Sequence, residues 1–556
     1  MKLISFVVPC YNSQEYMRHC IDTLLPGGDQ VEILIVNDGS SDNTAAIADE
    51  YEKKYPDICR AIHQENKGHG GAVNTGIKNA TGIYLKVVDS DDWVNEYAYG
   101  EILDTLAYAE ENKENRELLD QILAKAATFK GLNHREAAVL LECPLPEYKE
   151  KLFALAKEIK KAIYGDRIVL FAPLYLSNYC INGCVYCPYH SKNRDIKRKK
   201  LTQEQIKEEV IALEAMGHKR IVIESGEDPL NNPLDYILES IKTIYSIKNK
   251  NGEIRRVNVN IAACSVEDYK KLHDVGIGTY TLFQETYNKE NYEALHPTGP
   301  KSDYAYHTEA MDRAMEGGID DVGIGVLYGL EHYKYDFVGL LMHAEHLEAV
   351  HGVGPHTISV PRICPADDID VDDFSNAVPD DIFEKIVALI RVSTPYTGMI
   401  MSTRESQSMR ERGLALGISQ ISGGSRTSVG GYKEEEKPED NSAQFDRSDT
   451  RTLDEIVDWL LGLGYVPSFC TACYRAGRTG DRFMALAKSG QIHNCCQPNA
   501  LMTLNEYIMD YGDEKTKKHG AKVIEDQLEN IKNDLVKDKA KAYIAQMEDG
   551  KRDFRF

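Results

Sequence analysis

Three cysteines in one short segment carry the clearest chemical signal in the chain. Cys180, Cys184 and Cys187 follow the pattern C-x3-C-x2-C within NYCINGCVYC. Three thiolates on one tight loop can hold three irons of a 4Fe–4S cluster. The fourth iron then keeps an open site that a small molecule can chelate through an amino group and a carboxylate. Zinc is the alternative, but it prefers four protein ligands, usually from paired C-x2-C units, and this spacing differs from that pattern.

S-adenosylmethionine is a molecule that binds such an open iron. Electron transfer into its sulfonium breaks a C–S bond and yields a 5′-deoxyadenosyl radical. Tyr186 stands one residue before the last cysteine, where radical S-adenosylmethionine enzymes place an aromatic ring beside the adenine. The first cysteine group therefore predicts radical chemistry with this cofactor.

A second cysteine group lies near the far end of the chain. Cys470 and Cys473 form C-x2-C, and Cys496 follows after a further 22 residues. Three ligands again suit a cluster with one open iron. A small zinc ribbon is the alternative, with His493 or Cys495 as its fourth ligand. Cys495 and Cys496 are adjacent, and the spacing favours Cys496 as the ligand.

Between the two cysteine groups, strands and helices alternate. Eight short strand candidates, from RIVLFAPLYL to GISQISGG, are separated by helical segments such as TQEQIKEEVIALEAMG. This alternation over roughly 260 residues predicts an α/β fold with a (β/α)8 TIM barrel. Chemistry on such barrels collects at the carboxyl ends of the strands. The polar residues expected there are Glu224, Asn260, Gln284, Glu285, Arg362, Arg404 and Arg426.

The remaining segments divide the chain. Residues 1–97 show strands and helices of their own, residues 98–165 form a charged helical extension, and residues 166–430 form the barrel. Residues 431–450 are polar and aperiodic, and we expect a loop there. Residues 431–556 then form a C-terminal domain that is helical from about residue 451 and carries the second cysteine group.

Composition limits the partners and the compartment. The 556-residue chain has 65 lysines and arginines against 88 aspartates and glutamates, a formal net charge of -23. Phosphate contacts need clustered cations, so we expect neither nucleic acid nor a membrane as a partner. The chain has no apolar run long enough to span a bilayer and no secretory signal pattern. The 13 cysteines then indicate metal ligands or catalytic groups in the cytoplasm.

Residues from about 98 to 556 resemble the HydG family, the radical S-adenosylmethionine tyrosine lyases that mature FeFe-hydrogenase. The resemblance runs along this whole length. The turn after the second barrel strand reads ESGEDP and is similar to HydG, although radical S-adenosylmethionine enzymes in general have a Gly-Gly-Glu-Pro pattern there. Other stretches that carry the resemblance to HydG include RIVLFAPLYLSNYCINGCVYC, GTYTLFQETY, HPTGPKSDY, GVGPHTISVPR, SQISGGSRT and FCTACYRAGRTGDRFM.

The resemblance implies how the cofactor is bound. The ESGEDP turn would meet the methionine amino group, and Glu285 would meet the ribose hydroxyls. His307 and Arg313 would bind the cofactor carboxylate, and the alternative for Arg313 is a surface charge on a helix. The residues expected to bind S-adenosylmethionine are Tyr186, Glu224, Ser225, Gly226, Glu227, Asn260, Glu285, His307 and Arg313.

The resemblance also implies the reaction. Such an enzyme cleaves the Cα–Cβ bond of L-tyrosine into p-cresol and dehydroglycine. Dehydroglycine becomes carbon monoxide and cyanide on the second 4Fe–4S cluster, which carries an additional iron, for assembly of the hydrogenase H-cluster. Arg404 and Arg426 are the candidates for the substrate carboxylate. His346 is favoured over His343 as the ligand of the additional iron.

The same family implies its partners, which are other hydrogenase maturation proteins and a low-potential electron donor such as ferredoxin or flavodoxin in the cytoplasm of an anaerobe. Two other functions remain open. The first is a 2-iminoacetate synthase, similar to ThiH of thiamine biosynthesis, which would stop at dehydroglycine and would not need the second cysteine group. The second is a glycosyltransferase that acts through the first hundred residues.

Those first residues resemble the front half of a family 2 glycosyltransferase, a partial GT-A-like (Rossmann-like) α/β segment. Asp38 in VNDGSSDNT matches the uridine-binding loop, and Asp89 and Asp91 form a D-x-D pair suited to a divalent cation. The half that would carry the acceptor site and catalytic base is replaced by HydG-like sequence. We therefore expect a vestigial nucleotide-sugar and cation site without transferase turnover.

Overall fold

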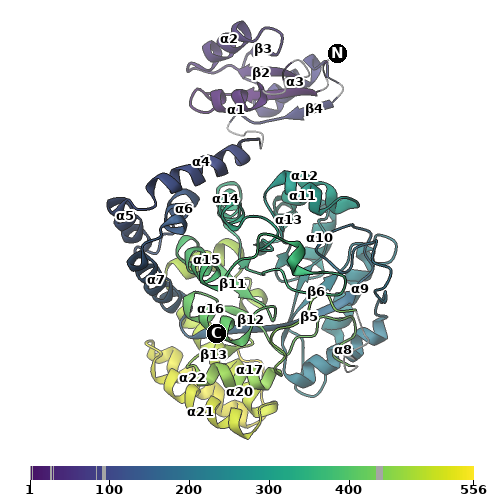
Figure 1. Ribbon diagram of the computed structural model, residues 1–556, viewed down its shortest axis with the longest axis vertical. Coiled ribbons are helices and arrows are strands. Elements are labelled where there is room, and N and C mark those ends of the chain that lie inside the picture. The colour runs from purple at the N-terminus through teal and green to yellow at the C-terminus, as the bar shows by residue number, and fades with distance from the viewer. Residues whose placement is uncertain are drawn as a thin grey trace. The chain divides into compact units, whose positions relative to one another are not determined.

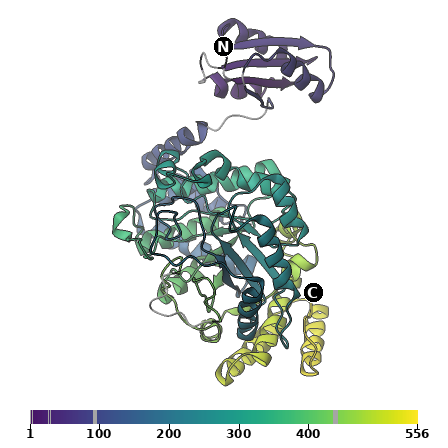
Figure 2. The same ribbon diagram turned by 90° about the vertical axis from the view of Figure 1, so that its right-hand side faces the viewer.

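A computed structural model describes residue 2 and residues 4–25, 28, 31–82, 84–90, 96–433 and 442–556 (Figures 1 and 2). The chain forms two compact units, Met1–Asp104 and Thr105–Phe556. None of the described helices combines the length and the apolar character needed to cross a membrane.

The front unit is a four-stranded parallel sheet in the order β3-β2-β1-β4. Successive residues of a strand point to opposite faces, so Ile33 and Ile35 join one apolar cluster while Leu34 and Val36 join another. The apolar segments ISFVVPCYN, VEILIVNDGS and GIYLKVVDSDDW predict three strands of this sheet from the sequence, whereas β3 was not predicted. Its strands are β1 (Ile4–Cys10), β2 (Val31–Asp38), β3 (Cys59–Gln64) and β4 (Tyr84–Val87), and its helices are α1 (Met17–Leu24), α2 (Thr44–Lys54) and α3 (His69–Asn79).

Helices α5 to α7 precede the barrel in the second unit. Asn133 and Glu136 form a reciprocal capping box at the start of α6, and Pro146 occupies the first turn of α7. The buried Lys385 of α15 (Asp380–Ser393) donates to the backbone oxygens of Leu141 and Cys143 and so fastens α6 to the barrel. The helices are α4 (Glu96–Asn112), α5 (Arg116–Ala126), α6 (His134–Glu142) and α7 (Pro146–Tyr164).

Eight parallel strands form a closed barrel, which confirms the predicted fold class. Strand β12 pairs with β5, so the sheet closes on itself. The strands are β5 (Arg167–Ser177), β6 (Arg220–Ser225), β7 (Arg256–Asn260), β8 (Tyr280–Thr281), β9 (Val322–Gly325), β10 (Thr357–Ser359), β11 (Gly398–Met401) and β12 (Gln420–Ser422). The intervening helices include α8 (Gln203–Met216), α9 (Leu234–Ser246), α10 (Val266–Asp274), α13 (Ala310–Glu316), α14 (Tyr333–His351) and α16 (Gln407–Leu416).

A ninth strand, β13 (Val466–Ser468), was not predicted. It pairs with the beginning of β5, with Val466 opposite Arg167 and Ser468 opposite Val169. Cys470 follows this strand directly, whereas Cys180 follows the opposite end of β5. The long strand β5 therefore runs from one cysteine group to the other. Six helices complete the C-terminal part of the chain, which Figure 1 draws in yellow-green to yellow. They are α17 (Leu453–Gly462), α18 (Ala472–Arg475), α19 (Gly480–Lys488), α20 (His493–Asp510), α21 (Glu514–Glu529) and α22 (Asp534–Glu548).

The turn after β8 is supported by a buried acid. Glu285 has a φ of 68°, which is uncommon for a residue with a side chain, and Thr286 N–H donates to Gln284 O at 2.9 Å. Asp336 of α14 accepts from the Thr286 hydroxyl at 2.9 Å and from Tyr287 N–H at 2.8 Å through one carboxyl oxygen. Burial raises the pKa of Asp336 from 3.8 to about 8. Asp336 therefore holds the turn that carries Glu285.

This raised pKa predicts how stability depends on pH. The proton on Asp336 contributes stability fully below pH 3.8, and that contribution is lost as the pH rises through about 8. Asp336→Asn keeps the accepting oxygen and cannot ionise. The melting temperature of Asp336→Asn relative to wild type should therefore be higher at about pH 9 than at about pH 6, by several degrees. An equal difference at both pH values in anaerobic thermal melts would contradict the assignment.

Candidate functional site

The first cysteine group lies at the carboxyl end of β5, on the wall of a cavity. Cys180, Cys184 and Cys187 all line it. Burial raises the pKa of Cys180 and Cys187 and raises that of Cys184 to about 11, so the thiols hold their protons at neutral pH unless metal displaces them.

The donor set of this cavity fits an iron–sulfur cluster. Cys180, Cys184 and Cys187 bring three thiols to one cavity wall. Cysteine thiolates are the ligands that hold such clusters.

The cysteine loop is fastened to the turn after β6. Ile181 N–H donates to Glu227 O at 2.8 Å, and the Asn182 amide donates to the Glu227 carboxylate at 2.6 Å. At Gly226, an added Cβ would lie 2.4 Å from Tyr179 O and 3.0 Å from Cys180 Cβ, so only glycine permits this close approach. The glycine of the ESGEDP turn thus lets the turn and the cysteines share one wall.

Of the nine residues expected to bind the cofactor, eight line this cavity. They are Tyr186, Glu224, Ser225, Gly226, Glu227, Asn260, Glu285 and His307. Arg313 is not among the described lining residues. Its Nε donates to Cys264 O at 3.1 Å, and its guanidinium lies 3.8 Å from the centroid of the Tyr306 ring. The structure therefore places Arg313 behind Tyr306, which does line the cavity.

His296 and Lys301 position two of the expected cofactor residues, Tyr186 and Glu285. His296 Nδ1 lies 2.7 Å from Tyr292 O and must donate to it, so Nε2 accepts from the Tyr186 hydroxyl at 2.8 Å. Burial lowers the pKa of His296 to about 3 and keeps the ring neutral for this role. Lys301 Nζ lies 2.7 Å from the Glu285 carboxylate in the cavity. Lys301 was not predicted, although it lies in HPTGPKSDY, one of the stretches that carry the family resemblance.

A second cavity continues inward through the barrel. It shares Glu224, Asn260 and Arg404 with the first. Burial raises the pKa of Glu224 to about 8, while hydrogen bonding from Asn260 and the charge of Arg404 oppose that shift. Arg404 forms no ion pair with a carboxylate of the described residues, and its guanidinium lies 3.8 Å from the Phe445 ring centroid.

The other arginines at the strand ends serve different contacts. Arg362 pairs with Glu405 and, at 2.9 Å, with Asp380. Arg426 is not among the described residues that line either cavity, and its backbone N–H donates to the Tyr432 hydroxyl at 3.1 Å. Of the two candidates for the substrate carboxylate, the structure brings only Arg404 to the cavities.

The second cysteine group lines a third cavity at the opposite end of β5. Cys470, Cys473 and Cys496 all contribute to its wall. The neighbouring Cys495 is only 7% exposed and belongs to an apolar cluster with Phe483 and Ile492. Gln420 lines both this cavity and the barrel cavity. His493, considered as a zinc ligand, instead hydrogen bonds to Ala162 O at 2.7 Å.

A histidine that was not predicted lies in this third cavity. His356 lines it together with the three cysteines, and its Nδ1 is 3.3 Å from Asp321. His343 and His346 lie elsewhere on α14, where they contact the Tyr287 hydroxyl at 2.7 Å and Asp312 at 2.8 Å, respectively. The signal for His356 was its place immediately before β10, because the amino ends of barrel strands meet at the end of the barrel where β13 and Cys470 lie.

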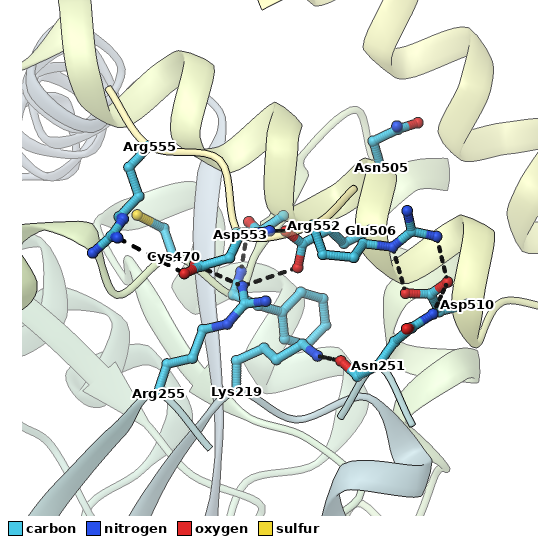
Figure 3. A network of polar contacts seen from close by, with 12 residues as sticks. Lys219, Asn251, Arg255, Cys470, Asn505, Glu506, Asp510, Arg552, Asp553 and Arg555 are labelled. Atoms are coloured by element: carbon cyan, nitrogen blue, oxygen red, sulfur yellow. Dashed lines mark hydrogen bonds and ion pairs between the residues drawn. The ribbon is translucent and has the colours of Figure 1, made fainter. Parts of the chain in front are cut away.

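A network of charged side chains lies beside Cys470 of the second cysteine group (Figure 3). Arg220 donates to Cys470 O at 2.8 Å and lines the cavity. Arg255 pairs with Glu506 at 2.9 Å, and both side chains are 3% exposed. Arg220 therefore ties the cysteine loop to the barrel, and Arg255 ties α20 to the barrel, through charged hydrogen bonds, which are stronger than neutral ones.

Two of the three aspartates of the predicted nucleotide-sugar and cation site, Asp38 and Asp89, lie among the described residues of the front unit. Asp38 at the end of β2 accepts from Gln64 at 2.6 Å and from Lys67 N–H at 2.9 Å. Asp89 pairs with His69 at 2.7 Å. Asp91 lies outside the described residues.

Three family models match the chain. The radical SAM superfamily covers residues 174–342, the biotin and thiamin synthesis associated domain covers residues 359–466, and glycosyl transferase family 2 covers residues 5–112. The uncharacterized glycosyltransferase EpsJ of Bacillus subtilis is 46% identical over 94 residues, which span 17% of this chain and 27% of EpsJ. The front segment therefore spans about a quarter of that relative.

The longer second unit is similar to solved structures and to curated enzymes. The 2-iminoacetate synthase of Salmonella typhimurium is 28% identical over 344 residues, 62% of this chain and 88% of the relative. A crystal structure of HydG from Carboxydothermus hydrogenoformans, an FeFe-hydrogenase maturase, is 38% identical with a TM-score of 0.71, covering 81% of this chain and 99% of the other.

Another crystal structure, also of HydG, a maturase of the [FeFe]-hydrogenase, is 55% identical with a TM-score of 0.80. It covers 83% of this chain and 99% of the other. With the cysteine loop and the closed barrel, this similarity shows that the chain belongs to the HydG family of radical S-adenosylmethionine enzymes, preceded by a segment similar to glycosyl transferase family 2.

Proposed function

We propose that this enzyme cleaves the Cα–Cβ bond of L-tyrosine to p-cresol and dehydroglycine, and converts dehydroglycine to carbon monoxide and cyanide for assembly of the FeFe-hydrogenase H-cluster. The observation that carries this proposal is the arrangement of the two cysteine groups. They line cavities at opposite ends of β5, and both cavities share residues with the barrel interior. One barrel can therefore hold two reaction sites in series.

The residues of the first cavity bind the cofactors. When bound, the 4Fe–4S cluster and S-adenosylmethionine supply a 5′-deoxyadenosyl radical, and the second cluster with its additional iron supplies metal for the later step. Cys180, Cys184 and Cys187 would hold the first cluster. Glu285, held by Lys301 and by the turn on Asp336, would accept from the ribose hydroxyls.

The residues of the barrel interior bind tyrosine. Arg404 offers a guanidinium that no described carboxylate neutralises, suited to the substrate carboxylate through two hydrogen bonds. Glu224 lies on the same wall, and its pKa of about 8 lets it hold or release a proton near neutral pH. Arg404 would thus orient the substrate, with Glu224 close to its polar groups.

The third cavity would complete the reaction. Cys470, Cys473 and Cys496 would hold the second cluster, and we assign the additional iron to His356 in place of His343 or His346. What supports this choice is that His356 lines the same cavity as the three cysteines. Gln420 lines both the barrel cavity and the third cavity, so it lies on the route that dehydroglycine would take.

A 2-iminoacetate synthase is the second candidate, because curated relatives carry that name. It would stop at dehydroglycine, so it leaves the cavity around Cys470 without a role. For the front unit we propose nucleotide-sugar binding around Asp38 and Asp89 at most, without transfer, because this segment spans about a quarter of EpsJ. We further propose other maturation proteins and a low-potential electron donor as partners.

Variants of the two cysteine groups should differ in the products that they lose. Anaerobic reconstitution should give about eight irons per chain or slightly more. Cys180→Ala should abolish both p-cresol and carbon monoxide, because no radical forms. Cys473→Ala should keep p-cresol and lose carbon monoxide. If p-cresol fell equally in both variants, measured by chromatography beside carbon monoxide trapping, the proposed division of labour would be wrong.

Arg404 should control tyrosine binding. Arg404→Gln removes a charged, bidentate contact, so kcat/KM for tyrosine should fall about 10- to 100-fold, mostly through KM. Arg426→Gln is the matched control and should change kcat/KM less than about threefold. Iron content should stay unchanged in both variants. A larger loss in Arg426→Gln than in Arg404→Gln would assign the carboxylate to Arg426 instead.

His356 should retain the additional iron. His356→Asn should lose about one iron per chain relative to wild type while both clusters remain, as judged by iron and sulfide analysis with EPR. His346→Asn, which alters an exposed pair with Asp312, should keep that iron. The opposite outcome, with iron lost only from His346→Asn, would restore His346 as the ligand.

A further inference from the structure

The last described residues lie against both elements that carry the second cysteine group. We call residues 552–556, with the sequence Arg-Asp-Phe-Arg-Phe, the tail segment. Cys473 lies in α18, and Cys470 lies just before this helix. Cys496 lies in α20, and α19 separates the two helices in the chain. Two separate elements must therefore be held in register before three thiols can share one cluster.

Asp553 of the tail segment joins these elements to each other. Its carboxylate accepts from both terminal nitrogens of Arg475, at 2.8 and 2.5 Å, and Arg475 lies two residues after Cys473. Its backbone N–H donates to Glu506 of α20 at 2.6 Å. One tail residue therefore bridges the cysteine loop and the helix that carries Cys496.

The same residue also connects to the barrel (Figure 3). Arg255, directly before β7, donates to Glu506 at 2.9 Å and lies 3.5 Å from Asp553. Asp553 itself has a φ of 64°, an uncommon conformation for a residue with a side chain, which surrounding contacts must hold. The contacts to Arg475, Glu506 and Arg255 supply that constraint.

Other residues of the tail segment also contact α20 and the segment that follows Cys473. Arg552 forms two bonds to Asp510 of α20, at 2.8 and 2.7 Å. Phe556 O accepts from Arg478 at 2.6 Å, and Phe556 N–H donates to Asn499 at 2.9 Å. The Phe556 ring packs on the apolar cluster to which Cys473 and Cys496 contribute.

We propose that the tail segment is a clamp that fixes the cysteine loop against α20, and so controls retention of metal at the second cysteine group. Asp553 is its central positioning residue. The proposal rests on the proposed function in one respect, namely that Cys470, Cys473 and Cys496 hold a cluster.

The experiment isolates the second site. In a chain carrying Cys180→Ala, Cys184→Ala and Cys187→Ala, any reconstituted cluster belongs to the second group. Adding Asp553→Ala should raise the rate of iron loss to a chelator about tenfold and alter the EPR signal of the remaining cluster. Asp553→Asn, which keeps one accepting oxygen for Arg475, should show an intermediate rate.

Two further variants test coupling and specificity. Arg475→Ala should match Asp553→Ala, and the double variant should lose iron no faster than either single variant, because both changes remove the same contact. Arg555→Ala is the matched control from the same segment. Its side chain is 45% exposed and lies 3.9 Å from Asp553, so it should leave the rate unchanged.

The outcomes distinguish the clamp from the proposed function. If the parent chain with the three cysteine replacements takes up no iron, the second cluster itself is refuted. If the parent takes up iron and Asp553→Ala releases it at the parent rate, the clamp is refuted. With the first cysteines intact, Asp553→Ala should still form p-cresol at the wild-type rate. Loss of p-cresol together with the melting transition would show a general folding defect and would also overturn the clamp.

Discussion

Hydrogen bonds between β12 and β5 close the barrel, and every other feature of the site depends on this closure. A closed sheet has two ends and one interior, so residues at the two ends of β5 meet different cavities that share one lumen. The first cysteine group follows the carboxyl end of β5, and the second lies beside its amino end, where β13 extends the sheet. An open sheet would not enclose a path between them. Strand closure and the length of β5 therefore allow one barrel to hold the two sites of the proposed reaction.

Polar groups buried around this lumen are fixed by neighbours rather than by solvent. His296 orients Tyr186, Lys301 pairs with Glu285, and Asp336 supports the turn on which Glu285 sits. Burial keeps His296 neutral and raises the pKa values of Asp336 and Glu224. In a low-dielectric interior, each unpaired polar group is costly. The site is thus a set of paired groups in which Arg404 stands out as a cation without a described carboxylate partner.

The two cysteine groups are built differently. The three thiols of the first group come from a single loop, so local sequence positions them. Gly226 lets this loop approach the neighbouring turn closely. The second draws on two elements, and long-range charged contacts among Arg255, Glu506, Arg475 and Asp553 join them. A site assembled from separate elements depends more on its supporting contacts than a site within one loop.

The sequence by itself determined the fold class, the two cysteine groups and eight of the residues that line the first cavity. Alternating strands and helices leave a periodic signal, and cysteine spacing within one loop survives in any fold that keeps the loop together. Strands β3 and β13 lacked such a signal, because pairing with a neighbour defines them more than their own residues do. Tertiary structure alone brought Arg404 rather than Arg426 to the cavities, and His356 rather than His346 to the second group. These choices depend on which side chains converge across distant strands and helices, and the spacing of residues along a chain carries no record of that convergence.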